Sequence, residues 1–355
     1  MPRFWFWSLL ALAALLLPAT ARPQPAQQRI VAVGDLHGDY DAWAAIARQA
    51  GLTDARGKWA GGNATLVQLG DVVDRGPDSL KIIRHLMKLQ REAPKKGGRV
   101  IALVGNHEAM MMTGDFRYVH PGELAGFITS QSGQVRDRVY EANRKAIEAA
   151  YKARDPAMTP EAIKAAWIKT MPLGQLEYQA AWAPDGELGK WALANPAVVK
   201  LGDTLFVHGG ISAAYASLPI DGINRQVAEA LKAQNQSPTA IITHPQGPLW
   251  YRGLISRGDG DEATVAPIPQ NETVALTIDQ EVDLVLKSYG VKRIVVGHTP
   301  SREGIVAGLN GRLWRADSGI SRAYGGTLSY LEIMGDRVTA HTVPRPPGKA
   351  WGQAQ

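Results

Sequence analysis

The sequence predicts an α/β fold built around a parallel sheet, because apolar strand patterns alternate with amphipathic helical patterns from Arg29 onward. Three short runs rich in β-branched residues stop abruptly at Gly-Asp or Gly-Asn: residues 30–33, 65–69 and 100–104. Helical patterns separate these runs, and this βαβαβ order is typical of parallel strands joined by helical crossovers. A stretch without strand patterns, from about 113 to 195, then predicts a helical insertion.

The remaining elements follow from the same periodicities. Apolar residues recur at helical spacing in four segments: about 41–50, 80–89, 135–152 and 161–170. After the insertion we expect strands at 198–201 and 204–207, a helix at 279–289 and a strand at 293–296. Asn310-Gly311 and Gly335-Asp336 each lie between apolar runs, as two-residue hairpin turns do. The carboxy-terminal part is therefore predicted to be antiparallel.

Composition excludes several classes of site. The chain has 355 residues, of which 45% are hydrophobic and 20% charged, which is typical of a globular protein. It contains no cysteine, so disulfides, thiolate metal sites and cysteine nucleophiles are excluded. The net charge of +6 favours anionic substrates but is too diffuse to predict nucleic-acid binding.

The first 21 residues have the pattern of a signal peptide. A basic start at Arg3 precedes an apolar run over residues 4–17, and Ala19-Thr20-Ala21 fits a cleavage site. As a helix this run would span roughly 21 Å, less than the roughly 30 Å hydrocarbon core of a bilayer. We therefore expect a protein exported to the periplasm or secreted, without stable membrane association after cleavage. The alternative is that the segment is not cleaved and anchors the protein in the membrane.

Five segments place polar residues directly after an apolar strand. They are residues 34–39, 70–76, 105–108, 208–210 and 297–300. Ligands of α/β sheets bind at the carboxyl ends of strands, so these segments are expected to converge. Their carboxylates, imidazoles and amide suit divalent metal ions. One such segment alone could be a helix cap, a tight turn or a hydrogen-bonded histidine, but five in succession indicate a metal site.

These motifs resemble the calcineurin-like metallophosphoesterases. Gly-Asp-Val-Val-Asp-Arg-Gly at 70–76 and Gly-Asn-His-Glu at 105–108 are closest to the phosphoprotein phosphatase subgroup. Residues 114–119 and His-Gly-Gly-Ile-Ser at 208–212 further resemble its Shewanella-like, bacterial-type branch. The resemblance implies a four-layer α/β/β/α sandwich. Together with the signal-peptide, helical and Pro/Gly-rich patterns, it divides the chain into a signal peptide 1–21, a flexible leader 22–28, a metallophosphoesterase domain 29–343 with the insertion at about 113–195, and a loose tail 344–355.

The resemblance also implies a centre of two divalent or trivalent metal ions. Asp35 and His37 would bind the first ion and Asp71 would bridge. The second ion would be held by three further residues: Asn106, His208 and His298. The oxygen and nitrogen ligands admit manganese, iron, zinc or magnesium, so the identity of the metals stays open.

The implied reaction is in-line hydrolysis of a phosphomonoester by a metal-bridging hydroxide. Asp74 would orient His107, which would act as general acid, and Arg75 and Arg252 would bind the phosphate. Many relatives carry a second histidine two residues after the one at position 298. Here that position is Pro300, which agrees with the protein phosphatases and disfavours the phosphodiesterases.

A phosphorylated protein is the substrate class that the resemblance favours, with a small phosphoester also possible. The sequence does not distinguish phosphoserine or phosphothreonine from phosphotyrosine, and it gives no oligomeric state. Two alternatives stay open: a diadenosine-polyphosphate or nucleotide hydrolase, and a non-catalytic protein that binds a phospholigand or metal. His85, on a predicted helix, is expected at the surface or at an interface.

Overall fold

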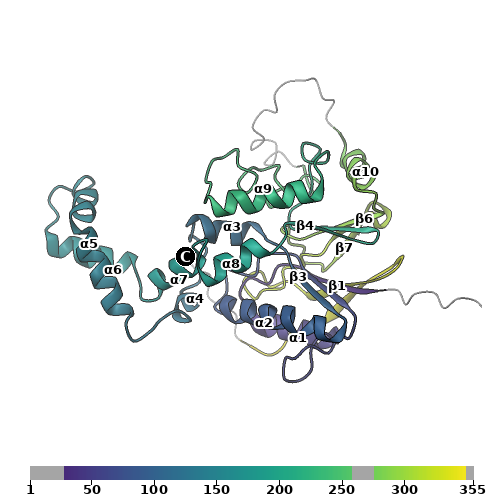
Figure 1. Ribbon diagram of the computed structural model, residues 1–355, viewed down its shortest axis with the longest axis horizontal. Helices are drawn as coiled ribbons and strands as arrows, with labels where there is room; N and C mark the ends of the chain where they lie inside the picture. Colours follow the sequence, from purple (N-terminus) through teal and green to yellow (C-terminus); the bar gives the residue numbers. More distant parts are fainter. Residues whose placement is uncertain (1–27, 258–275, 349–355) are drawn as a thin grey trace, which may run out of the picture.

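The computed structural model describes residues 28–257 and 276–348, and it contains two five-stranded sheets (Figure 1). The first sheet has the order β10 (Arg337–Val343), β9 (Leu328–Met334), β1 (Arg29–Val33), β2 (Thr65–Gln68), β3 (Arg99–Ala102). The second has the order β4 (Val198–Leu201), β5 (Thr204–Val207), β6 (Arg293–Val296), β8 (Leu313–Arg315), β7 (Val306–Gly308). As predicted, β1, β2 and β3 are parallel.

The side chains of β1 show how the two sheets pack. Ile30 and Ala32 belong to a core that also contains Phe206 of β5 and Val295 of β6, so this face meets the second sheet. The alternate residues, such as Val31, belong to the core shared with the helices. Successive side chains of a strand point to opposite faces, so a run that is apolar throughout is buried on both sides. This explains why the strands lack apolar–polar alternation.

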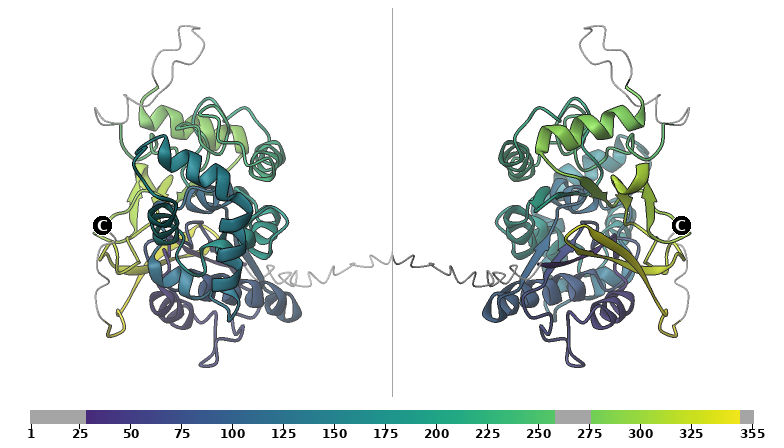
Figure 2. Two further views of the ribbon diagram at one scale, coloured as in Figure 1. Left: turned by 90° about the vertical axis from the view of Figure 1, so that its left-hand side faces the viewer. Right: turned by 90° about the vertical axis from the view of Figure 1, so that its right-hand side faces the viewer.

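Helices cover the outer faces of both sheets. The helices α1 (Tyr40–Gln49) and α2 (Ser79–Glu92) lie on the first sheet, and α9 (Ile220–Lys232) and α10 (Ile278–Tyr289) on the second (Figures 1 and 2). The Asp39 carboxylate caps α1 by accepting a hydrogen bond from the Ala42 amide. Thr277 and Gln280 form a capping box at the start of α10. The four-layer α/β/β/α sandwich is therefore confirmed.

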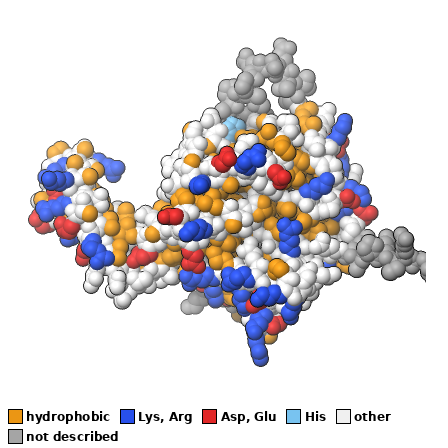
Figure 3. All heavy atoms as spheres, viewed as in Figure 1, with side chains coloured by type: hydrophobic (Ala, Val, Ile, Leu, Met, Phe, Trp, Pro, Cys, Tyr) orange, Lys and Arg blue, Asp and Glu red, His pale blue; other side chains and the backbone are white. Residues whose placement is uncertain are grey.

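The stretch expected to be helical contains no strand between α3 (Asn106–Thr113) and β4. Its helices are α4 (Pro121–Ala125), α5 (Ser132–Lys152), α6 (Pro160–Thr170), α7 (Gln175–Trp182) and α8 (Glu187–Ala194). The α5–α6 pair projects from the body (Figure 1) and is held together by Tyr140 and Trp167, whose ring centroids lie 5.3 Å apart. Figure 3 shows acidic and basic side chains intermixed on this arm.

Several details differ from the sequence-based expectations. Strand β8 pairs in parallel with β6, so the carboxy-terminal part is mixed rather than antiparallel. Asn310-Gly311 lies in a four-residue connection, because Gly308 pairs with Leu313, whereas Gly335-Asp336 is the two-residue turn that was predicted. Helix α9 was not predicted, although Ile223, Val227 and Leu231 bury one face of that helix.

The expectation for His85 was wrong. The imidazole is 8% exposed and lies between α1 and α2. Its Nδ1 accepts a hydrogen bond from the Trp43 indole at 3.0 Å, and its Nε2 lies 2.8 Å from the Gly57 carbonyl. A polar residue on a helix face is buried at low cost when both of its nitrogens have partners.

The predicted signal peptide and nearly all of the leader lie outside the described residues. Arg345, within the segment expected to be a loose tail, donates hydrogen bonds to the carbonyls of Ile320 and Gly326 at 2.7 and 2.8 Å. Over residues 28–257 and 276–348, no helix has both the length and the apolar character needed to cross a membrane.

Candidate metal centre

The predicted metal ligands meet where five parallel strands of the two sheets end. Asp35 follows β1 and Asp71 follows β2. Asn106 begins α3 just after β3, and His208 and His298 follow β5 and β6. All five side chains are at least 95% buried. Residues at the carboxyl ends of these strands lie together even when they are more than 250 positions apart in the sequence. The His298 amide, for example, donates a hydrogen bond to Asp35 Oδ1 at 3.1 Å.

The backbone of the site is unusual. Within the described chain, eight residues other than glycine have a positive φ angle, and five of them belong to the predicted site: His37 (40°), Asp71 (55°), Asp74 (70°), Arg75 (66°) and His298 (64°). Residues other than glycine rarely adopt this backbone conformation, and each such residue costs about 1–3 kcal/mol. Such a concentration marks a site where the direction of each side chain is held by its surroundings.

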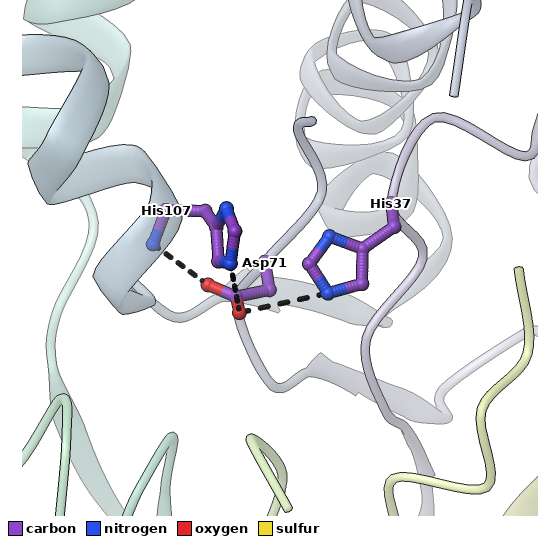
Figure 4. Close-up of side chains that lie close together, drawn as sticks. All are labelled: His37, Asp71 and His107. Carbon is purple, nitrogen blue, oxygen red and sulfur yellow. Dashed lines mark hydrogen bonds and ion pairs between the residues drawn. The ribbon is translucent and has the colours of Figure 1, made fainter. Parts of the chain in front are cut away.

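Asp71 lies at the middle of the cluster (Figure 4). Its Oδ2 is 3.7 Å from His37 Nε2, and its Oδ1 is 3.3 Å from His208 Nε2. The two oxygens of one carboxylate therefore face histidines from different sheets. The ligand atoms fall into two groups that could each hold an ion, with Asp71 in both: His37–Asp71–His107 and Asp71–His208–His298. Asp35, the other residue predicted for the first ion, has its Oδ2 3.8 Å from His37 Nε2, so Asp71 lies where a bridging carboxylate would.

Two of the histidines have their tautomer fixed by the backbone. Nδ1 of His37 is 2.8 Å from the Val73 carbonyl, and Nδ1 of His208 is 2.8 Å from the Leu69 carbonyl. A carbonyl can only accept, so in the neutral rings Nδ1 carries the hydrogen and the lone pair is on Nε2. Metal-binding histidines typically use their second nitrogen in this way. In His298, Nε2 is buried and has no hydrogen-bond partner among the described residues.

The charges of the cluster also suit a cation. Burial, Asp317 and Asp71 raise the pKa of Asp35 well above its ordinary value. Burial and the charge of His107 lower the pKa of His37 to about 3, so this ring is neutral at pH 7. A bound cation would relieve the repulsion between the carboxylates and use the lone pair of the imidazole. The residues present therefore fit a metal centre.

Glu108 connects the loops that carry these groups. Its Oε2 accepts hydrogen bonds from the amides of Asp71 and Gly105, at 2.9 and 2.8 Å, and its Oε1 accepts one from Val72 at 2.8 Å. The Asp71 carboxylate in turn accepts a bond from the His107 amide at 2.9 Å. The loop after β2 and the start of α3 are thus tied together by buried, charge-assisted bonds.

His107 and Asp74 form a buried pair beside this cluster. Nδ1 of His107 lies 2.5 Å from Asp74 Oδ2, and its Nε2 points toward Asp71 Oδ2 at 3.8 Å. Burial alone would lower the pKa of His107, but Asp71 and Asp74 outweigh it and raise the pKa above its ordinary value. The ring can therefore carry a proton on Nε2 toward the metal site.

The two arginines predicted to bind phosphate lie on different sides of the cluster. The Arg75 guanidinium stacks on the Tyr118 ring at 3.9 Å, and the Arg75 amide donates to the Tyr118 carbonyl at 3.0 Å. Arg252 donates from Nη1 to Thr299 Oγ1 at 3.3 Å, and its charge acts on His298. Tyr118 therefore contacts both the backbone and the side chain of Arg75, a role that the sequence motifs did not predict.

A cavity of about 580 Å³ opens beside Asn106. The ring of Tyr118, on one wall, lies 5.4 Å from the His107 ring, and Trp250, also on the cavity wall, lies 5.8 Å from the His298 ring. Met110 and Ile242 add apolar surface. An aromatic-walled space thus adjoins both halves of the cluster.

Comparison with known proteins decides the family. The model of the calcineurin-like phosphoesterase family matches residues 28–302. The chain belongs to this family. It is 32% identical over 318 residues to Shewanella-like protein phosphatase 2 of Arabidopsis thaliana, covering 87% of this chain and 76% of the relative. It is 29% identical over 317 residues to Shewanella-like protein phosphatase 1 of Plasmodium berghei, covering 88% and 73%.

A solved structure agrees with this placement. The crystal structure of a cold-active protein-tyrosine phosphatase of a psychrophilic Shewanella has 26% sequence identity and a TM-score of 0.63, covering 90% of this chain and 81% of that one. The protein is therefore a calcineurin-like, metal-dependent phosphatase of the Shewanella-like branch. The family implies divalent metal ions, and the His and Asp groups around Asp71 could hold them.

Some residues of this phosphoesterase were not assigned from the sequence. Glu108 had a signal, because it is the last residue of the Gly-Asn-His-Glu motif. Tyr118 lies in the 114–119 segment that resembles the Shewanella-like branch, but nothing in that segment assigns it a role. Trp250 was a candidate wall of a substrate groove, but packing was the expected role, because a chain with ten tryptophans uses most of them in packing. Asp317, by contrast, was expected from its place at a strand end to support the site; it is buried and acts electrostatically on Asp35.

Glu108→Ala tests how far this carboxylate organises the centre. The variant leaves three buried amides without their acceptor, so we expect metal affinity to fall by about 10–100-fold, as after loss of other supporting residues. Calorimetric titration with Mn²⁺ measures the change. Glu161→Ala, which removes an exposed carboxylate on α6, is the control. Equal affinities of the two variants would contradict the assigned role of Glu108.

Proposed function

We propose that the cluster holds two metal ions with Asp71 as the shared ligand. Asp35 and His37 bind the first ion, and the second is bound by Asn106, His208 and His298. The observation that carries this proposal is the orientation of Asp71, whose two oxygens face His37 on one side and His208 on the other. When bound, two such ions activate water and neutralise charge on a phosphoryl group. Manganese, iron, zinc and magnesium all suit these donors.

The chain's own residues then support hydrolysis of a phosphomonoester. Arg75 and Arg252 bind oxygens of the phosphoryl group, and Tyr118 keeps the Arg75 guanidinium in place. His107 protonates the departing oxygen from Nε2, while Asp74 holds its Nδ1–H. Proton donation of this kind contributes about 10²–10⁴-fold to the rate. A protein that only bound a phospholigand would not need this buried acid pair.

For the substrate we propose phosphorylated protein side chains, with phosphotyrosine preferred. The cavity beside Asn106 has room for a side chain and is walled by Tyr118 and Trp250. An aromatic ring can make edge or face contacts with these walls, worth about 0.5–1.5 kcal/mol each beyond area burial, which a serine side chain cannot. The relatives that match most of the chain are named as protein phosphatases, and the Shewanella enzyme as a protein-tyrosine phosphatase.

We also propose that the enzyme is exported to the periplasm or secreted, on the pattern of residues 1–21. When the full chain is expressed in a bacterial host, mass spectrometry should find a mature protein that begins after Ala21. Arg3→Glu, which removes the basic start, should accumulate unprocessed precursor. Processing that is equal in both chains, or absent in both, would contradict the proposal.

Replacing Asp71 tests the shared ligand. Asp71→Asn removes the charge between the two ions, and because metal stabilisation is worth several kcal/mol we expect kcat/KM on an aryl phosphate to fall about 10²-fold or more. Asp137→Asn, on the exposed side of α5, should keep full activity. A wild-type protein that binds metal without any metal-dependent turnover would instead favour the non-catalytic alternative.

A substrate panel tests the preference. Two peptides of identical sequence, one with phosphotyrosine and one with phosphoserine, are compared with diadenosine polyphosphates and nucleotides. We expect the highest kcat/KM for the phosphotyrosine peptide. Trp250→Leu should lower this value about 2–10-fold, the size of one aromatic contact, with a smaller effect on the phosphoserine peptide. Cleavage of the nucleotides with inert phosphopeptides would reverse the assignment.

A further inference from the structure

Asp74 has one oxygen that the His107 pair does not use. Oδ2 is engaged by the His107 ring, but the buried Oδ1 has no hydrogen-bond partner among the described residues. The same is true of Oε2 of Glu123, a carboxyl group that is 2% exposed. The buried Ser79 hydroxyl, which acts on Glu123, is also without a partner there, and it can donate only one hydrogen. Buried carboxylate oxygens are normally paired, so two unpaired carboxylate oxygens in one region require a further donor.

Packing places Glu123 against the loop that carries Asp74. The short helix α4 lies directly on residues that follow Asp74: a Cβ atom at Gly122 would be 2.7 Å from Pro77 Cβ, and one at Gly126 would be 3.4 Å from Leu80. Glycine at position 122 thus allows a close approach that any side chain would block. Glu123 is consequently near enough to Asp74 for the charge of one to act on the other.

Tyr178 of α7 determines which oxygen of Glu123 is an acceptor. Its hydroxyl donates to Oε1 at 2.9 Å and also lies 2.8 Å from Met111 Sδ. A protonated carboxyl group has one carbonyl oxygen and one hydroxyl. With Oε1 accepting from Tyr178, the hydroxyl falls on Oε2, the oxygen that is otherwise without a partner.

The electrostatics agree with a neutral Glu123. Burial and the Asp74 charge raise the pKa of Glu123 to about 8, although Tyr178, Ser79 and the Asp74 backbone favour ionisation. Two carboxylates buried together do not both ionise readily, and one proton between them satisfies an oxygen on each.

We propose that neutral Glu123 donates a hydrogen bond from Oε2 to Oδ1 of Asp74 and so positions the Asp74–His107 pair for acid catalysis. Asp74 then accepts one bond on each oxygen, from Glu123 and from His107. The bond fixes the plane of the carboxylate and hence the orientation of the His107 ring. Glu123 touches no substrate, so it is a positioning residue. Through Tyr178 it joins the helical insertion to the catalytic pair. This inference rests on the proposed role of His107.

A matched pair of variants of the metal-loaded, full-length enzyme tests the inference. Glu123→Gln keeps a donor for Asp74 and an acceptor for Tyr178, whereas Glu123→Met has a similar size and neither. Activity is measured on an aryl phosphate with a good leaving group and on an alkyl phosphate with a poor one. We expect Glu123→Met to lower kcat about 10-fold or more on the alkyl phosphate, where protonation by His107 matters, with little change in KM. Its effect on the aryl phosphate should be smaller, and Glu123→Gln should resemble the wild type on both.

Two controls separate positioning from general damage. In a His107→Asn background, Glu123→Met should cause no further loss, because both changes act on one proton transfer. Glu177→Ala removes a carboxylate of α7, the helix that carries Tyr178, and this carboxylate accepts a hydrogen bond from Ser132; the variant should leave both rates unchanged. Equal losses on both phosphates, or a Glu123→Gln variant as impaired as Glu123→Met, would overturn the inference and leave the phosphatase assignment intact. Retained hydrolysis of the alkyl phosphate by His107→Asn would instead count against the proposed acid.

Discussion

The carboxylate of Glu108 ties together the two loops on which the centre is built. It accepts amide hydrogens from Asp71 and Val72 on one loop and from Gly105 on the other. Bonds to a charged acceptor contribute about 1.5–3 kcal/mol each, and a buried amide left without a partner would cost a similar amount. The relative position of Asp71 and the start of α3 is therefore fixed before any ion binds. The position of Asp71 relative to the other predicted metal ligands depends on these three hydrogen bonds.

The strained backbone at the site follows from the same requirement. Asp71, Asp74 and Arg75 have positive φ angles within five residues of one another, so their loop reverses direction tightly after β2. The turn directs Asp71 toward the His37 and His208 rings and Asp74 toward His107. Strain of this kind persists only where surrounding contacts determine the conformation. Here the amide bonds to Glu108 and the Arg75–Tyr118 backbone bond supply those contacts.

Much of the fold and of the centre could be predicted, because their determinants are local in the sequence. A strand that ends at Gly-Asp or Gly-Asn places its polar residue at the edge of the sheet, so Asp35, Asp71 and Asn106 could be assigned together. The pairing of β8 with β6 could not, because the order of strands is decided by packing between distant segments. His85 illustrates the same limit, since its partners Trp43 and Gly57 are remote in sequence.

The same distinction separates the chemistry of this phosphatase from its selectivity. Residues that bind ions must lie at fixed positions relative to the strand ends, and so they form recognisable motifs. The walls of the cavity come from segments with no such constraint: Tyr118 follows α3, and Trp250 follows α9. Glu123 likewise belongs to a five-residue helix whose sequence carries no signal. Since this helix is part of the insertion, the proposed hydrogen bond from Glu123 would allow a change in the insertion to alter the Asp74–His107 pair without altering any motif residue.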